Sequence, residues 1–206
     1  MLLKKSEKTK QRILNETIKL MSKKGYASTS TQEIAKNANI SEATIYKYYK
    51  NKDNLLKTIV INTIEKLFES SSQEKIPKVI YKNIDKEPKL LLASLINERL
   101  NFFDSHKKEL KVIFQEMLIN KKVQKYFKNE IWSKMVKVSD EIFNQIKKQS
   151  KLKDDIDGYM FRKSLFGMIF FTIIFEEILE ENQEMNNNKQ AVLVSEMIFD
   201  GIISKK

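Results

Sequence analysis

The chain has 206 residues, enough for one large hydrophobic core or two smaller domains, and a formal net charge of +11. It contains no cysteine, which excludes disulfides, thiol chemistry and cysteine-bound metal, and its four glycines and two prolines suit a nearly all-helical protein. Residues 1–57 carry 13 Lys or Arg against 5 Asp or Glu, a net of +8, whereas the other residues carry 25 against 22, a net of +3. This uneven charge favours a partner with a phosphate backbone. A helix that binds a membrane surface would need a free apolar face opposite its lysines, but the first predicted helix needs its apolar face for the protein core.

The first predicted helix covers residues 7–24 and ends at Gly25. The residues before it hold no apolar stretch of the kind found in signal peptides, so we expect a bacterial cytoplasmic protein. A basic cluster at the helix start either reaches a DNA phosphate or the minor groove, or forms an ordinary solvated end. This cluster consists of Lys4, Lys5, Lys8, Lys10 and Arg12. The stripe predicted to be buried consists of Ile13, Leu14, Thr17, Ile18, Leu20 and Met21.

Two short helices joined by a tight turn are predicted in residues 29–52. Ser30, with a glutamate three positions later, has the spacing of a capping box, in which the serine hydroxyl accepts the amide of that glutamate. Asn39 tolerates the left-handed backbone that ends helices, and Ser41 is a good N-cap for the second helix. This pattern is typical of a helix-turn-helix, whose second helix lies in the major groove of DNA.

The outward face of the second helix has the character of a base-reading surface. On a helical wheel of about 100° per residue, Ile45, Tyr48 and Tyr49 face the core. The other positions are small, basic or hydrogen-bonding, as the major groove requires, although a solvated helix face is the alternative. The three arginines of the chain lie outside this motif, so an arginine fork cannot read guanine there. We therefore expect the bases to be read by Gln32, Ala43, Thr44 and Lys47.

The motif resembles the DNA-binding domain of the tetracycline-repressor (TetR) family over roughly residues 8–57. The matching positions are Gly25, Thr29-Ser30, Ile34-Ala35, Ala38-Asn39-Ile40-Ser41, Tyr46, Tyr49, Lys52 and Leu55. Asn39 replaces the glycine that is usual in the family, and Tyr49 replaces the usual phenylalanine. By this resemblance Thr31, Tyr46 and Lys52 contact phosphates. The predicted DNA-binding set is completed by Ser30, Ser41 and Lys50.

The resemblance implies an all-α fold with two domains, an N-terminal three-helix helix-turn-helix domain (residues 1–57) and a C-terminal helical ligand-binding and dimerisation domain (residues 58–206). Apolar periodicity predicts helices at 52–69, 77–84, 88–103, 106–119, 123–149, 158–181 and 188–203, with a loop at 70–75 and a charged connector at 151–157. Ser105 is the predicted N-cap of the helix that starts at residue 106. No flexible linker follows residue 57, so the helix at 52–69 is expected to connect the two domains mechanically.

The segment 165–175 is almost continuously apolar, yet at about 1.5 Å per residue it is too short to cross a bilayer core of about 30 Å. A helix that is apolar on all sides must be buried on all sides, so one face is expected to pack against a second subunit. The dimer interface of the TetR family is similar, because the last two helices of each subunit form a four-helix bundle. The predicted interface consists of Phe170, Ile174, Val194 and Ile198.

Arg99 falls in the middle of the apolar face of the predicted helix 88–103, and its guanidinium cannot lose its charge. Three explanations are open: an ion pair with an internal acid such as Glu116, Glu176 or Glu177, a bidentate bond to the carboxylate of an apolar ligand, or a stem that snorkels to water. The ligand alternative predicts a small-molecule site formed by Arg99, Phe102, Phe103, Phe114, Met117 and Phe171.

No enzymatic activity is expected, because the sequence holds no Gly-rich phosphate loop, no His/Glu metal pair at helical spacing and no nucleophile beside a base. The single histidine, His106, is predicted at a helix start, and neither a cofactor nor a metal is predicted. The favoured function is a homodimeric transcriptional repressor that binds a palindromic DNA operator and is released by a small, largely apolar effector. The alternative is a nucleoid-type structural DNA-binding protein without an effector.

Overall fold

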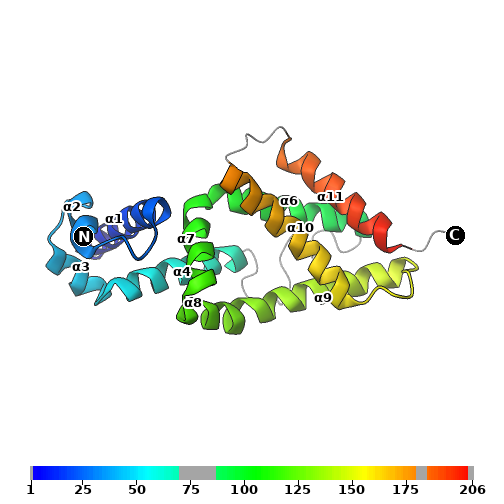
Figure 1. Cartoon of the computed structure of the whole chain (residues 1–206), viewed down its shortest axis with the longest axis horizontal. Helices are drawn as coiled ribbons and strands as arrows, with labels where there is room; N and C mark the ends of the chain where they lie inside the picture. The colour runs from blue at the N-terminus through cyan, green and yellow to red at the C-terminus, as the bar shows by residue number, and fades with distance from the viewer. Residues whose placement is uncertain (1, 70–86, 180–184, 204–206) are drawn as a thin grey trace. The chain divides into compact units, whose positions relative to one another are not determined.

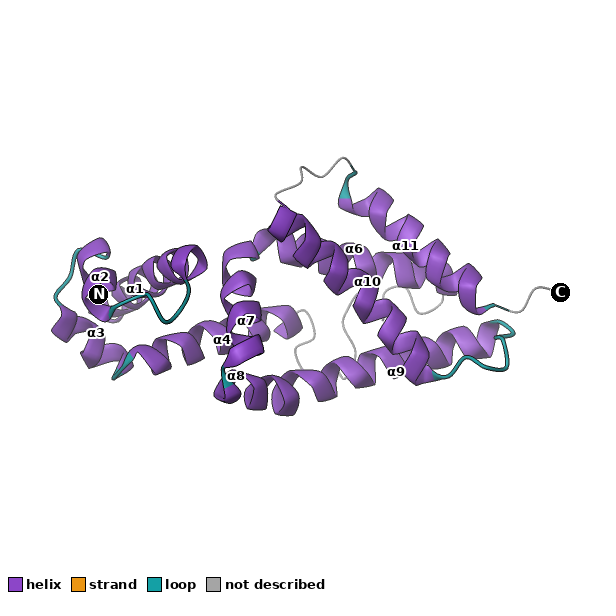
Figure 2. Cartoon of the chain, viewed as in Figure 1, coloured by secondary structure: helices purple, strands orange, loops and turns teal. Residues whose placement is uncertain are grey.

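The computed structural model describes residues 2–69, 87–179 and 185–203 (Figure 1). In these ranges the regular structure is helical (Figure 2), and a single antiparallel bridge joins Leu152 to Ile203. The predicted all-α fold is therefore confirmed. The chain forms two compact units, the first from Met1–Leu67 with His106–Asn129 and the second from Phe68–Ser105 with Glu130–Lys206. These units are defined by packing alone, so the predicted functional boundary after residue 57 stays a prediction.

The first unit is built around the helix-turn-helix. Its helices are α1 (Leu2–Lys24), α2 (Thr31–Asn37), α3 (Glu42–Tyr49), α4 (Lys52–Glu69), α7 (Lys107–Ile119) and α8 (Lys121–Tyr126). Within the unit, α1 packs against α2 and also against α7, and α2 packs against α3. The apolar stripe predicted for α1 supplies this contact, since Ile13 and Met21 are fully buried. The α7 side of the core consists of Leu110, Val112 and Ile113.

Local side-chain caps begin α2, α3 and α4, and the predicted caps at Ser30 and Ser41 are confirmed. The Ser30 hydroxyl accepts the amide of Glu33 at 3.1 Å, and the Ser41 hydroxyl accepts the amide of Thr44 at 3.3 Å. In the same way the Asn51 side chain accepts the amide of Asn54 at 2.9 Å and starts α4. Each cap satisfies a backbone donor that the helix itself cannot satisfy.

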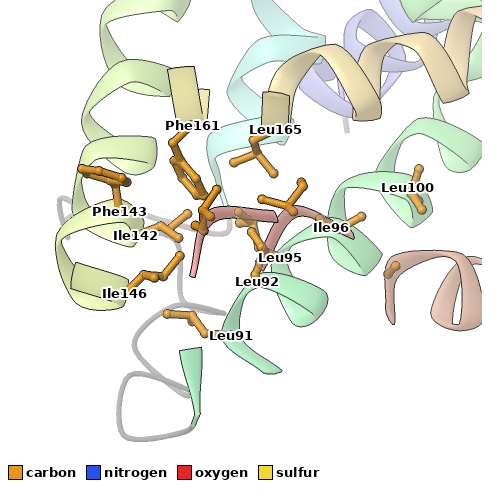
Figure 3. Packing of buried hydrophobic residues seen from close by; sticks show 13 residues of the cluster. Leu91, Leu92, Leu95, Ile96, Leu100, Ile142, Phe143, Ile146, Phe161 and Leu165 are labelled. Carbon is orange, nitrogen blue, oxygen red and sulfur yellow. The ribbon is translucent and has the colours of Figure 1, made fainter. Parts of the chain in front are cut away.

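The second unit contains α6 (Pro88–Ser105), α9 (Ser133–Gln149), α10 (Gly158–Leu179) and α11 (Asn187–Ile202). Helices α6 and α11 lie along one another, and α10 packs against α6, α9 and α11. Its core is a single apolar cluster in which Leu92, Ile142 and Phe161 are almost fully buried (Figure 3). The rings of Phe143 and Phe161 lie 5.4 Å apart between their centroids. None of the helices in the described ranges combines the length and apolar character needed to cross a membrane.

Three predicted elements differ from the structure or fall outside it. Ser105 does not cap α7, because it still belongs to α6 and its hydroxyl donates to the Asn101 carbonyl at 2.8 Å. The helix predicted as continuous over 123–149 begins earlier and is divided into α8, a π-helical turn η1 (Phe127–Trp132) and α9. The side chain of Asn120 starts α8 by accepting the amide of Lys122 at 3.1 Å. The predicted loop at 70–75 and helix at 77–84 lie outside the described residues.

Candidate nucleic-acid interface

The tight turn of the helix-turn-helix depends on one residue with a left-handed backbone. Asn39 has a φ of 50° and follows α2, whose last carbonyls accept the amides of Ala38, Asn39 and Ile40. Asparagine adopts this conformation more readily than most residues with a side chain, which is why the sequence could predict the turn. The chain then enters α3 at the Ser41 cap. The turn at Asn39 and the cap at Ser41 together determine where α3, the second helix of the helix-turn-helix, begins.

Most of the predicted DNA contacts lie on the surface of the first unit. Those whose side chains are exposed are Ser30, Gln32, Ser41, Ala43, Tyr46, Lys47 and Lys50, and those that are half-buried are Thr31, Thr44 and Lys52. The helical-wheel prediction that Ile45 and Tyr49 face the core is confirmed, because both side chains are buried. The same prediction is wrong for Tyr48, which is only half-buried, with the ammonium groups of Lys10 and Lys47 each 5.9 Å from its ring centroid. Such a position is amphipathic, with one face of the ring towards cations.

Glu42, which the sequence analysis did not select, lies at the centre of a hydrogen-bonded group on this surface. Its Oε1 accepts the hydroxyl of Thr31 at 2.5 Å and the hydroxyl of Tyr46 at 3.1 Å. The two hydroxyl oxygens are themselves 3.1 Å apart. Thr31 is the first residue of α2, whereas Glu42 and Tyr46 lie one turn apart on α3. The helical spacing of Glu42 and Tyr46 was visible in the sequence, but the approach of Thr31 depends on the packing of α2 against α3.

Lys52, one of the predicted phosphate contacts, makes several contacts within the first unit. Its ammonium donates to the carbonyls of Tyr26 and Thr29, at 2.9 Å each, and lies 3.4 Å from the carbonyl of Ala27. It also lies 4.3 Å from the centroid of the Tyr26 ring, within the range of a cation–π contact. Because an ammonium has three donors, this conformation leaves none for a phosphate. Lys52 therefore joins the start of α4 to the turn after α1, and its predicted phosphate contact stays a prediction.

A second set of bonds joins the same turn to α8. Asp53 accepts the hydroxyl of Tyr26 and pairs with the ammonium of Lys122 at 2.5 Å. The bond from Lys122, followed by that from Tyr26, lowers the pKa of Asp53 below its ordinary value of 3.8. Stability from this carboxylate is therefore present above pH 3.8 and is lost as the pH falls through its folded pKa. The pKa of Tyr26 is raised, first by burial and then by the bond to Asp53.

Lys50 occupies the tight connection between α3 and α4. Its φ is 54° and its ψ is −46°, and the amide of Asn51 donates across it to the carbonyl of Tyr49 at 2.5 Å. A side-chain-bearing residue in this γ-turn is strained. The sequence offered no sign of it, because lysine has no preference for this conformation. The turn directs the exposed Lys50 side chain away from the regular path of α3.

The predicted ligand-binding residues divide between the two units. Phe114 and Met117 belong to the first unit, whereas Arg99, Phe102, Phe103 and Phe171 belong to the second. The rings of Phe102 and Phe103 meet edge to face with centroids 6.3 Å apart. Phe171 is 63% exposed. The proposed grouping of all six side chains therefore stays a prediction.

Arg99 is buried, with 14% of its side chain exposed, and its Nε lies 2.7 Å from Oε2 of the neighbouring Glu98. The snorkelling explanation is therefore wrong, and the acid beside Arg99 is one that the sequence analysis did not consider. Burial lowers the pKa of Arg99, whereas the charge of Glu98 raises it. Burial also raises the pKa of Glu98, although Arg99 opposes this shift. Of the predicted partners, Glu116 accepts the side-chain amide of Asn120 at 3.1 Å, and the side chains of Glu176 and Glu177 lie outside the described residues.

The predicted dimer residues are only partly available to a partner. Phe170 is 40% exposed on α10, but Ile198 is 3% exposed and belongs to the core of its own unit. Val194 also packs against that core, and the side chain of Ile174 lies outside the described residues. The exposed apolar side chains of α11 that the sequence analysis missed are Val192, Leu193 and Met197. The apolar positions of α11 occupy two faces of the helix, and the sequence analysis selected the face that is buried within the unit.

Comparisons with known proteins agree with this geometry. Residues 13–59 match the family model described as bacterial regulatory proteins, tetR family. The chain is 48% identical over 52 residues to YvkB, an uncharacterised HTH-type transcriptional regulator of Bacillus subtilis, a match that covers 25% of this chain and 28% of YvkB. It is 22% identical to the fatty acid metabolism regulator protein of the same organism, over 94% of this chain and 95% of that protein.

The fold is shared with solved structures over nearly the whole chain. One of them is the transcriptional regulator FadR of Bacillus subtilis in complex with stearoyl-CoA, with a TM-score of 0.70 and 21% sequence identity. The similarity covers 93% of this chain and 98% of that one. At this level of identity the similarity establishes the fold of both parts of the chain.

The position of Lys52 generates a stability prediction. Lys52→Ala is expected to destabilise the first unit by about 2 kcal/mol, because it leaves the part-buried carbonyls of Tyr26 and Thr29 without their charged donor. Thermal unfolding followed by circular dichroism would measure this loss. Lys57→Ala, which removes an exposed lysine from the same helix, is the matched control and should leave the midpoint nearly unchanged. Equal midpoints for the two variants would show that the carbonyl contacts of Lys52 contribute little.

Proposed function

Because the chain belongs to the TetR family of bacterial regulatory proteins, we propose that it is a sequence-specific DNA-binding transcriptional regulator. In its specific form, the proposal is a homodimeric repressor that leaves a palindromic operator when a small, largely apolar effector binds. The observation that carries the proposal is the capped helix-turn-helix with an exposed, basic outer face on α3. Such a protein acts where the chromosome is, which for a bacterium is the cytoplasm.

The proposed base-reading surface consists of the N-terminal half of α2 and the outer face of α3. Ala43 and Lys47 are exposed one helical turn apart, so both can reach the floor of the major groove from one side of α3. Gln32 is exposed on α2, and Thr44 is held by Ser41, whose hydroxyl lies 2.8 Å from its own. Lys47 is the longest and only charged member of this set, so it is the residue whose loss should matter most.

Dimerisation through α10 and α11 is supported by the two-sided distribution of apolar residues on α11. On a wheel of about 100° per residue, the buried residues Ala191, Ser195 and Ile198 cluster on one face. Leu193 and Met197, which are 41% and 65% exposed, lie about 200° and 240° away from Ala191. A helix that is apolar on opposite faces has a second surface to bury, and a copy of the same chain would supply it.

Phe170 and Phe171 extend this apolar surface onto α10. They lie roughly 180° and 280° from the buried Phe161 on the same wheel, and they are 40% and 63% exposed. Because α10 packs against α11, the exposed side chains of both helices belong to one region of the second unit. We propose this region as the dimer interface in place of Val194 and Ile198.

An apolar acid is the proposed effector. Arg99 is a buried cation near Phe102 and Phe103 on α6, and it pairs with the neighbouring Glu98, whose carboxyl pKa is raised by burial. A guanidinium can also bind the carboxylate or phosphate of a ligand through two parallel hydrogen bonds, and such a ligand would be held in an apolar pocket by this cation. A related protein is named a fatty acid metabolism regulator, and a structural neighbour binds stearoyl-CoA. Both names support a fatty acyl compound as the first effector to test.

The proposed mechanism is a shift between two populations of the dimer. In the DNA-binding state the two recognition helices would stand about one DNA turn apart, ~34 Å, and fit two half-sites of a palindrome. An effector that binds another spacing more tightly shifts the population by its difference in affinity, typically ~1–3 kcal/mol. Helix α4 would carry the motion, since Lys52 and Asp53 at its start hold the turn that leads into α2.

Lys47 provides the test of sequence reading. An operator selected from a pool of random duplexes should lose ~1–3 kcal/mol of binding free energy with Lys47→Ala, because a base contact is removed, whereas a random duplex should lose much less. Fluorescence anisotropy with both duplexes would measure the two losses, and Lys57→Ala on α4 would control for the change in net charge. Equal losses on operator and random DNA would make Lys47 a phosphate contact. Failure to select any operator would favour the nucleoid-type alternative.

The oligomeric state tests the proposed interface. Leu193→Lys combined with Met197→Lys is expected to give a monomer by light scattering, because a buried interface would have to hold two charges without partners. Asn188→Lys adds a charge at an exposed position of the same helix and should leave the dimer intact. A dimer that survives the double change would place the interface on another part of the chain.

Stearoyl-CoA tests the effector proposal in a DNA-release assay with the selected operator. We expect the wild-type protein to release DNA as stearoyl-CoA is added, and Arg99→Leu to bind DNA normally but to need at least tenfold more ligand, because it lacks the cation for the ligand's acidic group. Arg162→Leu is the control, since Arg162 belongs to the same unit, has a similarly low side-chain exposure of 15% and pairs with Asp140 at 2.5 Å. Equal loss of response in both variants would indicate a general weakening of the unit.

A further inference from the structure

We infer that Glu42 is an intramolecular competitor for DNA phosphates and acts as a brake on DNA binding by the first unit. The inference rests on the proposed function and on the phosphate contacts that the resemblance to the TetR family implies for Thr31 and Tyr46. Both of their hydroxyls are bonded to the Glu42 carboxylate in the structure. Glu42 is therefore a positioning residue that lowers the affinity for DNA, whereas the hydroxyls of Thr31 and Tyr46 raise it.

The competition follows from the number of protons in the group. Each hydroxyl has one proton to donate, and a phosphate offers only acceptor oxygens, so a hydroxyl can serve either Glu42 or a phosphate. The Thr31 oxygen lies 2.5 Å and the Tyr46 oxygen 3.1 Å from the same oxygen of Glu42. A hydrogen bond to a charged acceptor is about twice as strong as one between neutral groups. A phosphate must therefore displace a carboxylate that already holds the donors in place.

The charge of Glu42 distinguishes it from the other acids of residues 1–57. Glu7, Glu16, Glu33 and Asp53 each pair with a lysine, respectively Lys10, Lys19, Lys24 and Lys122. Glu42 is bonded instead to two neutral hydroxyls, so its negative charge is not offset by its partners. It stands at the start of α3, the helix proposed to enter the groove, where phosphates lie on both sides.

The consequence is a weaker hold on DNA that does not depend on sequence. Phosphate contacts carry no sequence information, so a brake on them lowers the affinity for operator and random DNA alike. The protein therefore spends less time bound to random sequence. On the operator, the base contacts compensate for the weaker phosphate contacts. Glu42 would thus limit the non-specific binding that the net charge of +8 on residues 1–57 favours.

Glu42→Gln tests the inference, because it removes the charge while preserving the shape of the side chain. The measurement is the affinity of the full chain for a random-sequence duplex over a series of salt concentrations. Glu42→Gln is expected to bind about fivefold more tightly than the wild type, the worth of one released hydrogen bond, and to show a steeper salt dependence by up to about 1 in log–log slope. Glu65→Gln is the matched control, an exposed acid about 20 Å along α4 from Lys52, beyond the screening length.

A second background separates competition for hydroxyls from the effect of charge alone. In a chain that already carries Thr31→Val and Tyr46→Phe, the hydroxyls are absent, so Glu42→Gln should change the affinity less than twofold. An equal gain in both backgrounds, or a gain no larger than that of Glu65→Gln, would overturn the inference while leaving the proposed function intact. Weaker binding of Glu42→Gln to the selected operator alone would also overturn it and make Glu42 a base contact. If the wild-type chain bound no duplex even at low salt, the proposed function would fail, and this inference with it.

Discussion

The ammonium of Lys52 holds together the part of the structure on which the helix-turn-helix depends. It donates to carbonyls of the turn between α1 and α2, and it does so from the first turn of α4. Because this turn sets where α2 begins, and α2 in turn packs against α3, the direction of the recognition helix depends on contacts made at the start of α4. Asp53, the next residue, adds the bonds to Tyr26 and to Lys122 of α8. Two consecutive residues therefore place three helices of the first unit.

The acidic residues of the basic segment 1–57 have structural roles that the net charge of this segment does not reveal. The net charge predicts a partner with phosphates, but in a net charge each carboxylate only cancels one positive charge, whatever its position or its contacts. In the structure, Glu33 pairs with Lys24 next to the N-terminal cap of α2, and Asp53 joins α4 to α8. Glu42 orders two hydroxyls on the surface proposed to meet DNA. Of these acids, Glu42 is the one that contacts two hydroxyls for which the sequence analysis expected a role in DNA binding.

The features that could be predicted from the sequence are those that arise within a few residues. The caps at Ser30 and Ser41, the left-handed turn at Asn39 and the burial of Ile45 all follow from short-range chemistry. The features that could not be predicted depend on groups brought together by packing, such as Lys52 with the carbonyls of the turn after α1. Apolar periodicity also could not say which neighbour covers a face, so Ile198 was assigned to a partner although it packs in its own core. The π-helical turn η1 has no glycine or proline to reveal it.

The composition of the first unit from two separate segments has a consequence for the order in which the protein can fold during synthesis. Helix α1, in which Ile13 is buried, packs against α7, whose buried Ile113 is made 100 residues later. While the ribosome makes the intervening chain, α7 is not yet available to pack against α1. Apolar side chains that α7 later covers are therefore exposed to water. Contacts between such distant residues form slowly, and partly folded chains with open cores are prone to association. The early helices therefore have to persist with incomplete packing, and strong local caps are the property that would let them do so.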